Sequence, residues 1–229
     1  MQDPNTANAS TEQDAADQGT VDAFHRLYYA QPERTWMQTY WMGASVLKSP
    51  LDLWIYQEII HEVKPDLIVE CGTYKGGSAL FLASICDLIG RGKVVTVDVE
   101  VHADRPNHPR LHYLLGSSTA PEILTQVRDY ALDAATTLVI LDSDHSRAHV
   151  LDELHTYREV VTPGSYLIVE DTCINGHPLL PDFGPGPMEA VEEFLLEACE
   201  YSSDRSREKL YMTFNPRGFL RRMSANTQQ

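Results

Sequence analysis

The sequence predicts a single α/β domain built around a doubly wound, mostly parallel sheet of seven strands. Strand-like and helix-like segments alternate along most of the chain, which is typical of a parallel sheet covered by helices on both faces. The expected strands are short and continuously apolar, as strands buried on both faces are. The 229 residues, 43% of them apolar, are enough for one large core with an elaborated N-terminus.

The first strongly marked element is a helix that follows the N-cap residue Ser49 and has Pro50 in its first turn. Its apolar residues recur at helical spacing as far as Lys64. Further helices are expected at 77–89, 121–132, 147–160 and 187–199, and strands at 66–70, 93–98, 111–115, 137–142, 166–170, 209–214 and 218–222. The last two strands are joined by Asn215-Pro-Arg-Gly218, so they should form a C-terminal antiparallel hairpin.

The N-terminal part of the chain divides into two segments. Residues 1–20 are polar and carry no large apolar side chain apart from Met1, which predicts a disordered tail. Residues 21–64 are expected to form a helical cap before the main domain at 65–223, which a short tail at 224–229 follows. The cap contains these aromatic residues: Phe24, Tyr28, Tyr29, Trp36, Tyr40 and Trp41.

The aromatic residues of this cap cannot all be left in water. They can cover the core, line a substrate pocket or contact a neighbouring subunit. Covering the core is the favoured interpretation, because exposed aromatic patches are rare on soluble proteins. The same apolar surface makes a homo-oligomer the expected state of the protein.

Charge and cysteine content narrow the range of partners and locations. The chain has 33 acidic and 18 basic residues, a formal net charge of -15 and no basic stripe, which argues against binding to nucleic acid. The four cysteines are widely separated and form no C-x-x-C pair, so reduced thiols are expected. No run approaches the roughly 18 apolar residues of a membrane span, and residues 1–20 lack a hydrophobic signal core. A cytoplasmic protein without a membrane partner is therefore expected.

A glycine-rich turn, Glu70-Cys-Gly72-Thr-Tyr74-Lys-Gly76-Gly-Ser78, connects the first expected strand of the main domain to a helix. Glycines there let a ligand approach the backbone, and the helix N-terminus favours a carboxylate or phosphate. The spacing is not G-x-G-x-x-G, and the acidic Glu70 would receive a dinucleotide pyrophosphate poorly, which disfavours NAD. The pattern instead suits a ligand with both an ammonium and a carboxylate group, such as S-adenosylmethionine (SAM).

Two further positions fit the same ligand. Asp98 ends the second strand, where an acid in a doubly wound fold accepts hydrogen bonds from ribose hydroxyls. Ser117, in the Gly-Ser-Ser sequence after the third strand, would face the adenine. Singly, these residues are also consistent with an ordinary strand-ending acid and ordinary turns, but their order and placement favour a methyl-donor site.

Two buried strands end in acidic residues. Asp142-Ser-Asp-His145 follows one of them and Glu170-Asp171 follows the next. All carboxyl ends of parallel strands lie on one edge of a sheet, so the two groups can meet in one crevice. Asp144 is expected to face solvent, and the other three carboxylates beside an imidazole suggest a hard divalent cation with a base next to it. An ordinary helix-starting histidine is the alternative for His145, whereas adjacent acids after a buried strand require neutralisation.

In combination, the glycine turn, Asp98 and the two acidic groups resemble the class I SAM-dependent methyltransferases. More narrowly, Trp41-x-Gly43, the glycine turn, the Asp-x-x-His element and the Glu-Asp pair resemble the cephalosporin hydroxylase family. That family includes metal-dependent O-methyltransferases that act on sugar hydroxyls, such as rhamnosyl and macrolide-sugar methyltransferases. The resemblance covers roughly residues 41 to 222.

The resemblance implies Mg²⁺ bound by Asp142, Glu170 and Asp171, with His145 as the general base. It also implies SAM as methyl donor and a hydroxyl of a small molecule, a sugar or a glycosylated natural product, as acceptor. The full set of expected donor contacts is Glu70, Gly72, Tyr74, Gly76, Ser78, Asp98, Ser117 and Asp142.

The loop at 172–187 is the expected place of acceptor binding. It is longer than most connections in a compact domain, and long loops carry function disproportionately. His177 and Phe183 are its candidate acceptor contacts, and plain packing of the loop is the alternative for both.

Two other functions compete with methyl transfer. An Fe(II)-dependent hydroxylase would use His145 and His149, which are four residues apart and can share a helix face near Asp142. Three carboxylates with one offset histidine favour magnesium over that site. A non-catalytic binding protein on a methyltransferase fold is the third possibility, against which the retained acids and His145 argue.

Overall fold

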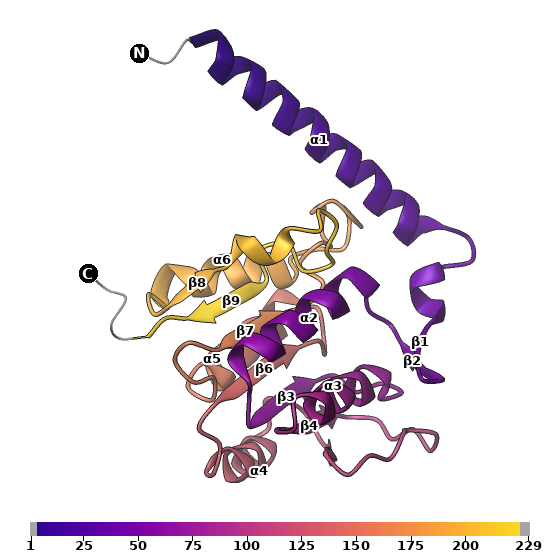
Figure 1. Cartoon of the computed structure of the whole chain (residues 1–229), viewed down its shortest axis with the longest axis vertical. Coiled ribbons are helices and arrows are strands. Elements are labelled where there is room, and N and C mark those ends of the chain that lie inside the picture. The colour runs from indigo at the N-terminus through magenta and orange to yellow at the C-terminus, as the bar shows by residue number, and fades with distance from the viewer. Residues whose placement is uncertain (1–3, 225–229) are drawn as a thin grey trace.

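The computed structural model describes residues 4–224, with side chains from residue 16 onward. Its main sheet has seven strands in the order β5-β4-β3-β6-β7-β9-β8 (Figure 1). These strands are β3 Leu67–Cys71, β4 Lys93–Asp98, β5 Leu111–Leu115, β6 Thr137–Leu141, β7 Tyr166–Val169, β8 Tyr201–Ser203 and β9 Phe219–Arg222. The five strands β3 to β7 run parallel to one another, and β9 and β8 are antiparallel additions at one edge. The predicted doubly wound fold is confirmed.

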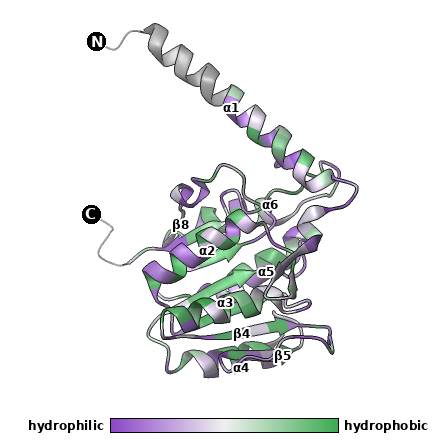
Figure 2. Cartoon of the chain, turned by 45° about the vertical axis from the view of Figure 1, so that its right-hand side comes forward, coloured by the Kyte–Doolittle hydropathy of each residue, from purple (hydrophilic) through white to green (hydrophobic). Residues whose placement is uncertain are grey.

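Helices cover both faces of this sheet. The helices and 3-10 turns of the described chain are α1 Pro4–Ala30, η1 Thr35–Gln38, α2 Pro50–Val63, α3 Gly77–Leu88, α4 Pro121–Ala131, α5 Arg147–Tyr157, α6 Pro187–Glu197 and η2 Arg205–Glu208. A small antiparallel pair, β1 Thr39–Trp41 and β2 Ala44–Val46, precedes α2. Figure 2 shows the apolar strands enclosed between the helices.

Alternate residues of each central strand supply two cores. Leu67 and Val69 of β3 pack with buried residues of α4, α5 and α6, whereas Ile68 between them packs with α2 and α3. The continuous apolar sequence of β3, β6 and β7 follows from this, because both faces of each strand are buried. The layers therefore leave the carboxyl ends of the parallel strands as the place where polar residues can gather.

The C-terminal antiparallel pair is confirmed, but its first strand differs from the expected one. The strand that pairs with β9 is β8, not residues 209–214. The segment 209–214 forms no strand, and the buried Asp52 of α2 binds two of its polar groups: it accepts the Phe214 N–H at 2.8 Å and the Thr213 hydroxyl. Because a carboxylate takes the place of a partner strand, alternating apolar residues form no strand here.

Helix α1 also differs from expectation, because it includes residues from Pro4 onward that the composition predicts to be disordered. After Pro4 the chain has no further proline or glycine before Gly19, and it is rich in alanine, glutamine and acidic residues that tolerate helix. Figure 1 shows α1 projecting from the rest of the chain. Residues 1–3 of the predicted N-terminal tail and residues 225–229 of the predicted C-terminal tail lie outside the described residues.

The aromatic cap residues both cover the core and reach a cavity. Tyr28, Tyr29 and Trp36 pack on a small apolar cluster that includes Phe214, and Tyr29 stacks on Trp36 with ring centroids 5.0 Å apart. Tyr29 and Trp36 also line a cavity of about 690 Å³, called the main cavity below. Phe24 is half exposed.

The four cysteines are free thiols, of which only Cys199 is exposed. Within residues 4–224, no helix has the length and apolar character needed to cross a membrane.

The buried His25 of α1 gives a test of how this helix packs on the body. Its imidazole stacks on Phe214 with ring centroids 5.3 Å apart, and burial lowers its pKa from 6.5 to about 4. The unfolded chain therefore takes up a proton first, so the stability that the neutral imidazole contributes is complete above about pH 6.5 and is lost as the pH falls toward 4.

We expect urea unfolding to show that the wild type loses about 2 kcal/mol more stability between pH 7 and pH 5 than His25→Phe does. His61→Phe, at an exposed position of α2, should follow the wild type. An equal loss in all three proteins would contradict the packing of His25 on Phe214.

Candidate functional site

A cavity of about 690 Å³ lies at the carboxyl edge of the parallel strands. The glycine turn borders one part of it, and the acidic residues after β6 and β7 border another. The residues expected from the sequence that line it are Gly72, Tyr74, Ser78, Asp98, Ser117, Asp142, His145, Asp171 and Phe183. Two groups of functional residues that were predicted separately thus share one cavity.

The glycine turn is shaped by close packing of the backbone. Gly72 has φ of +95°, and a Cβ there would lie 1.7 Å from the backbone oxygen of Asp142. Gly76 has φ of +76°, and its Cβ would lie 2.9 Å from the Tyr113 hydroxyl. Each of these two positions requires glycine, and this requirement comes from the protein itself and does not depend on a bound ligand. The turn brings the N-terminus of α3, with Ser78 in its first turn, to the cavity wall.

Glu70 lies behind the glycine turn and is fully buried in β3. Its Oε2 accepts a hydrogen bond of 2.7 Å from Thr96, while Oε1 has no hydrogen-bond partner among the described residues. Burial raises the pKa of this carboxyl, although the nearby Lys48 charge opposes the shift. Of the predicted donor contacts, Glu70 and Gly76 are not among the residues that line the cavity.

Asp98, at the end of β4, holds the glycine turn in place. Its Oδ2 accepts the N–H groups of Thr73 at 3.1 Å and Tyr74 at 2.6 Å, together with the Arg105 guanidinium at 3.0 Å. Its Oδ1 accepts the Glu100 N–H at 2.9 Å, which leaves a lone pair on that oxygen for a ligand hydroxyl. Arg105 is a neighbour that the sequence pattern did not reveal.

Three groups from two loops converge in the acidic part of the cavity. The Nε2 atom of His145 is 3.3 Å from Asp142 Oδ1 and 3.3 Å from Asp171 Oδ2. One ligand atom from each of these residues lies within 4.8 Å of the others, so the group can hold a metal ion. Asp171 has φ of +54°, and Asn215 accepts its N–H at 3.1 Å. The predicted meeting of two strand ends is therefore what the fold produces.

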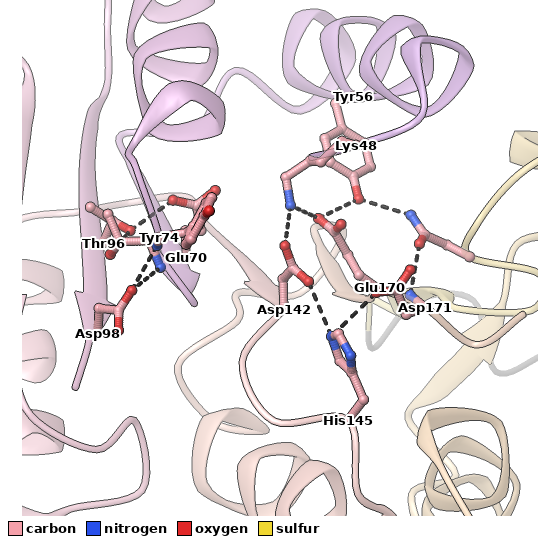
Figure 3. A network of polar contacts seen from close by, with 12 residues as sticks. Lys48, Tyr56, Glu70, Tyr74, Thr96, Asp98, Asp142, His145, Glu170 and Asp171 are labelled. Carbon is pink, nitrogen blue, oxygen red and sulfur yellow. Dashed lines mark hydrogen bonds and ion pairs between the residues drawn. The ribbon is translucent and has the colours of Figure 1, made fainter. Parts of the chain in front are cut away.

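Glu170 has a different environment from the other two acids (Figure 3). Its Oε1 accepts a hydrogen bond of 2.6 Å from Lys48 and one of 2.8 Å from the Tyr56 hydroxyl. The Tyr56 oxygen in turn accepts a bond of 2.9 Å from Asn215. Both of these hydrogen bonds fall on Oε1 rather than Oε2, and Glu170 is not among the residues that line the cavity. Glu170 is consequently outside the compact group of Asp142, His145 and Asp171.

Lys48 is a neighbour of these acids that the sequence pattern did not reveal. It lies between β2 and α2, and its ammonium is 2.6 Å from Asp142 Oδ2 as well as from Glu170. Burial alone would lower its pKa, but the two carboxylates raise the pKa above its usual value, so the ammonium keeps its charge. A single lysine between Val46-Leu47 and a helix cap is the only signal for it in the sequence.

The protonation of His145 follows from the same charges. Burial acts to lower its pKa, but the carboxylates of Asp142 and Asp171 raise the pKa to about 9. Burial and the charge of Asp142 raise the pKa of Glu170 well above its usual value. Three acids thus face two bases in this crevice, which leaves one excess negative charge when all five groups are ionised.

Other predicted residues lie elsewhere. His177 borders a second cavity of about 300 Å³ and is 3.0 Å from Glu189, so it does not line the main cavity where an acceptor contact was expected. The cis peptide bond at His177-Pro178 lies at this second cavity. His149 lines the main cavity, but its Nε2 is 3.2 Å from the Ser118 hydroxyl and 3.5 Å from Glu153. In the part of the chain that the structure describes, two histidines and a carboxylate do not converge as an iron site would require.

Part of the cavity wall is apolar. Phe183 borders the cavity and is 46% exposed, consistent with the predicted role of its loop. The other apolar residues of this wall come from the N-terminal cap and from the loop after β7: Tyr29, Trp36, Leu47, Ile174 and Leu180.

Removal of the Tyr56 hydroxyl tests whether its hydrogen bond to Glu170 stabilises the protein. Tyr56→Phe deletes one of the two donors to a buried carboxylate oxygen, so we expect a loss of about 1–3 kcal/mol in the free energy of unfolding, measured with urea. Tyr40→Phe, at a position that is 64% exposed, is the matched control and should change stability by less than about 0.5 kcal/mol. Equal stabilities would show that Tyr56 does not support Glu170.

This chain is similar in sequence to known proteins along most of its length. The family model described as rhamnosyl O-methyltransferase/CmcI matches residues 33–223. Rhamnosyl O-methyltransferases of Mycobacterium leprae and Mycobacterium tuberculosis are each 42% identical to this chain over 207 residues. These alignments cover 87% of this chain, 89% of the first relative and 84% of the second.

Solved structures share the fold. A structure of CmcI with Mg and SAM matches with a TM-score of 0.65 at 21% identity, covering 82% of this chain and 78% of that chain. Apo CmcI matches with a TM-score of 0.64 at 22% identity over the same shares. This chain therefore has the fold of the CmcI structures.

Proposed function

Since this chain belongs to the rhamnosyl O-methyltransferase/CmcI family and is accordingly an O-methyltransferase, we propose that it uses SAM as donor and Mg²⁺ as cofactor. The proposed acceptor is a hydroxyl of a sugar or glycosylated small molecule. The observation that carries this proposal is the shared cavity. The glycine turn with Asp98 borders one part of it, and Asp142, His145 and Asp171 border another. A donor and an acceptor can therefore be held side by side.

The donor part of the cavity fits SAM in its chemistry. The N-terminus of α3, the free lone pair of Asp98 Oδ1 and Ser117 offer partners for a carboxylate, a ribose hydroxyl and an adenine. The unpartnered Oε1 of Glu70 gives negative potential behind the turn, as a cationic ligand requires. When bound, SAM supplies an electrophilic methyl group on its sulfonium. Gly72 and Tyr74 would border it.

The acidic part of the cavity fits a magnesium ion. Asp142 and Asp171 would bind it directly, and Oε2 of Glu170 is the third available oxygen. An oxygen-rich set with one excess negative charge is what a hard divalent cation requires. In that position Mg²⁺ would lower the pKa of an acceptor hydroxyl. The related CmcI fold has been solved with Mg and SAM, which supports the pairing of the two groups.

His145 is the proposed general base. Its pKa of about 9 depends on the negative charge of Asp142 and Asp171. A divalent cation on these carboxylates offsets that charge, so the pKa of the imidazole falls and its neutral form becomes available. A neutral imidazole beside the acceptor can take the hydroxyl proton as the oxygen attacks the methyl group.

The apolar wall supports a ring-shaped acceptor. Trp36 and Phe183 face the cavity together with the acids, so one side of a ligand would contact aromatic surface while its hydroxyls face carboxylates. The curated relatives are named rhamnosyl O-methyltransferases, which makes a rhamnosyl glycoside the first acceptor to test.

Asp171→Asn tests the metal role. Loss of one carboxylate should lower methyl transfer to a rhamnoside at least about 100-fold, because the hydroxyl is no longer acidified. The affinity for SAM, measured by titration calorimetry, should stay within about threefold of the wild type, since Asp171 lies outside the donor part. Asp182→Asn, an exposed acid of the same loop, is the control.

Two results would contradict the proposal. Full activity of the wild-type protein in EDTA would remove the metal from the mechanism. Failure of the intact protein to bind SAM would remove the donor, and with it the reaction class.

The Fe(II)-dependent hydroxylase is the less favoured function, because His149 is engaged by Ser118 and Glu153. Two results together would exclude it: full methyl transfer under nitrogen, and no oxygen consumption when the protein is incubated in air with acceptor and Fe(II).

We also propose that the protein is a homo-oligomer. Phe24 and Leu27 of α1 are 50% and 57% exposed, on a helix that projects from the body (Figure 1). Burial of such side chains against a second copy would remove apolar surface from water. Size-exclusion chromatography with light scattering should give a mass above the 25.8 kDa of one chain, and a monomer mass would contradict this.

A further inference from the structure

Lys48 is a buried cation inside the crevice that is proposed to bind another cation. Its side chain is 3% exposed, and its ammonium is 2.6 Å from a carboxylate oxygen of Asp142 and 2.6 Å from one of Glu170. A charge of this kind is costly to bury unless it is paired. The pairing is complete here, so the lysine neutralises part of the acidic group permanently.

The two oxygens of Asp142 face different partners. Oδ2 accepts the Lys48 ammonium, and Oδ1 faces His145 (Figure 3). Glu170 is divided in the same way, with Oε1 engaged by Lys48 and Tyr56. The space for a metal ion is therefore next to, and separate from, the space that the ammonium occupies.

The surrounding backbone holds Lys48 in place. Val46 is 1% exposed and Ser49 is fully buried. The residue after these, Pro50, begins helix α2, whose inner side is part of the core. The backbone around Lys48 is therefore anchored on both sides, two carboxylates hold its ammonium, and the residue borders the cavity. We expect the ammonium to remain beside the carboxylates when another ligand enters.

We propose that Lys48 is a fixed internal counter-ion that weakens the binding of the divalent cation and holds Asp142 and Glu170 in position before it arrives. This inference rests on the proposed metal role of the acidic residues. Lys48 acts through Asp142 and Glu170, so it is a positioning residue. A positive charge a few ångströms from a divalent cation, with little water between them, repels it strongly. Reversible metal binding suits an enzyme whose acceptor and product exchange at the metal.

The test compares Mn²⁺ binding to the full-length protein and its variants, measured from the free Mn²⁺ signal in electron paramagnetic resonance. Lys48→Met should bind Mn²⁺ at least tenfold more tightly than the wild type, because the repelling charge is gone. Lys48→Arg keeps the charge and should stay within threefold of the wild type. Lys209→Met, which removes an exposed lysine paired with Glu58, should not change the affinity.

A second measurement needs no variant. Reductive dimethylation of the wild-type protein, read by mass spectrometry, should leave Lys48 unmodified with and without Mn²⁺, while Lys209, half exposed, reacts in both cases. Modification of Lys48 only when Mn²⁺ is present would show that the metal displaces it, which overturns a fixed counter-ion.

The outcomes separate this inference from the proposed function. If the wild type and Lys48→Met bind Mn²⁺ equally, the counter-ion role is wrong and the metal role stands. If the wild type binds no Mn²⁺, the metal role fails and this inference fails with it.

Discussion

The concentration of negative charge at one edge of the sheet is the constraint on which the rest of the site depends. Asp142, Glu170 and Asp171 are brought together by β6 and β7, and such a group is stable only where cations offset it. The protein supplies Lys48 and His145 for this purpose, which is one positive charge fewer than the acids. The remaining imbalance is the physical basis for proposing a cationic ligand in this crevice.

Both ends of the sequence take part in building this crevice. Lys48 and Tyr56 come from the N-terminal cap, and Asn215 comes from the connection before β9. Asn215 links the Tyr56 hydroxyl to the backbone of Asp171. The cap, for which a cover over the core was expected, therefore also supplies side chains that hold the acids.

Sequence patterns predict the parts of the molecule that are local or follow from topology. Continuous apolar runs locate β3 to β7, and the common edge of parallel strands brings Asp142 and Asp171 together. Lys48 could not be found in this way, because its partners are distant in sequence and nothing in its own surroundings requires a buried charge. The segment 209–214 has the alternation of a strand, but the side chain of Asp52 takes up its polar groups instead. His177 lies in a loop whose path depends on tertiary contacts with Glu189, so proximity in sequence to Phe183 did not give it the same role.

The contact between Gly72 and the backbone of Asp142 sets a limit on how this enzyme can diversify. It joins the donor turn to the acidic loop through main-chain atoms, so the spacing of the two parts does not depend on any side chain that can be exchanged. Substitutions in the loop around Phe183 or in the aromatic cap can then change which acceptor fits, while the reacting groups keep their separation. Redesign of acceptor specificity should therefore concentrate on that wall and leave the junction untouched.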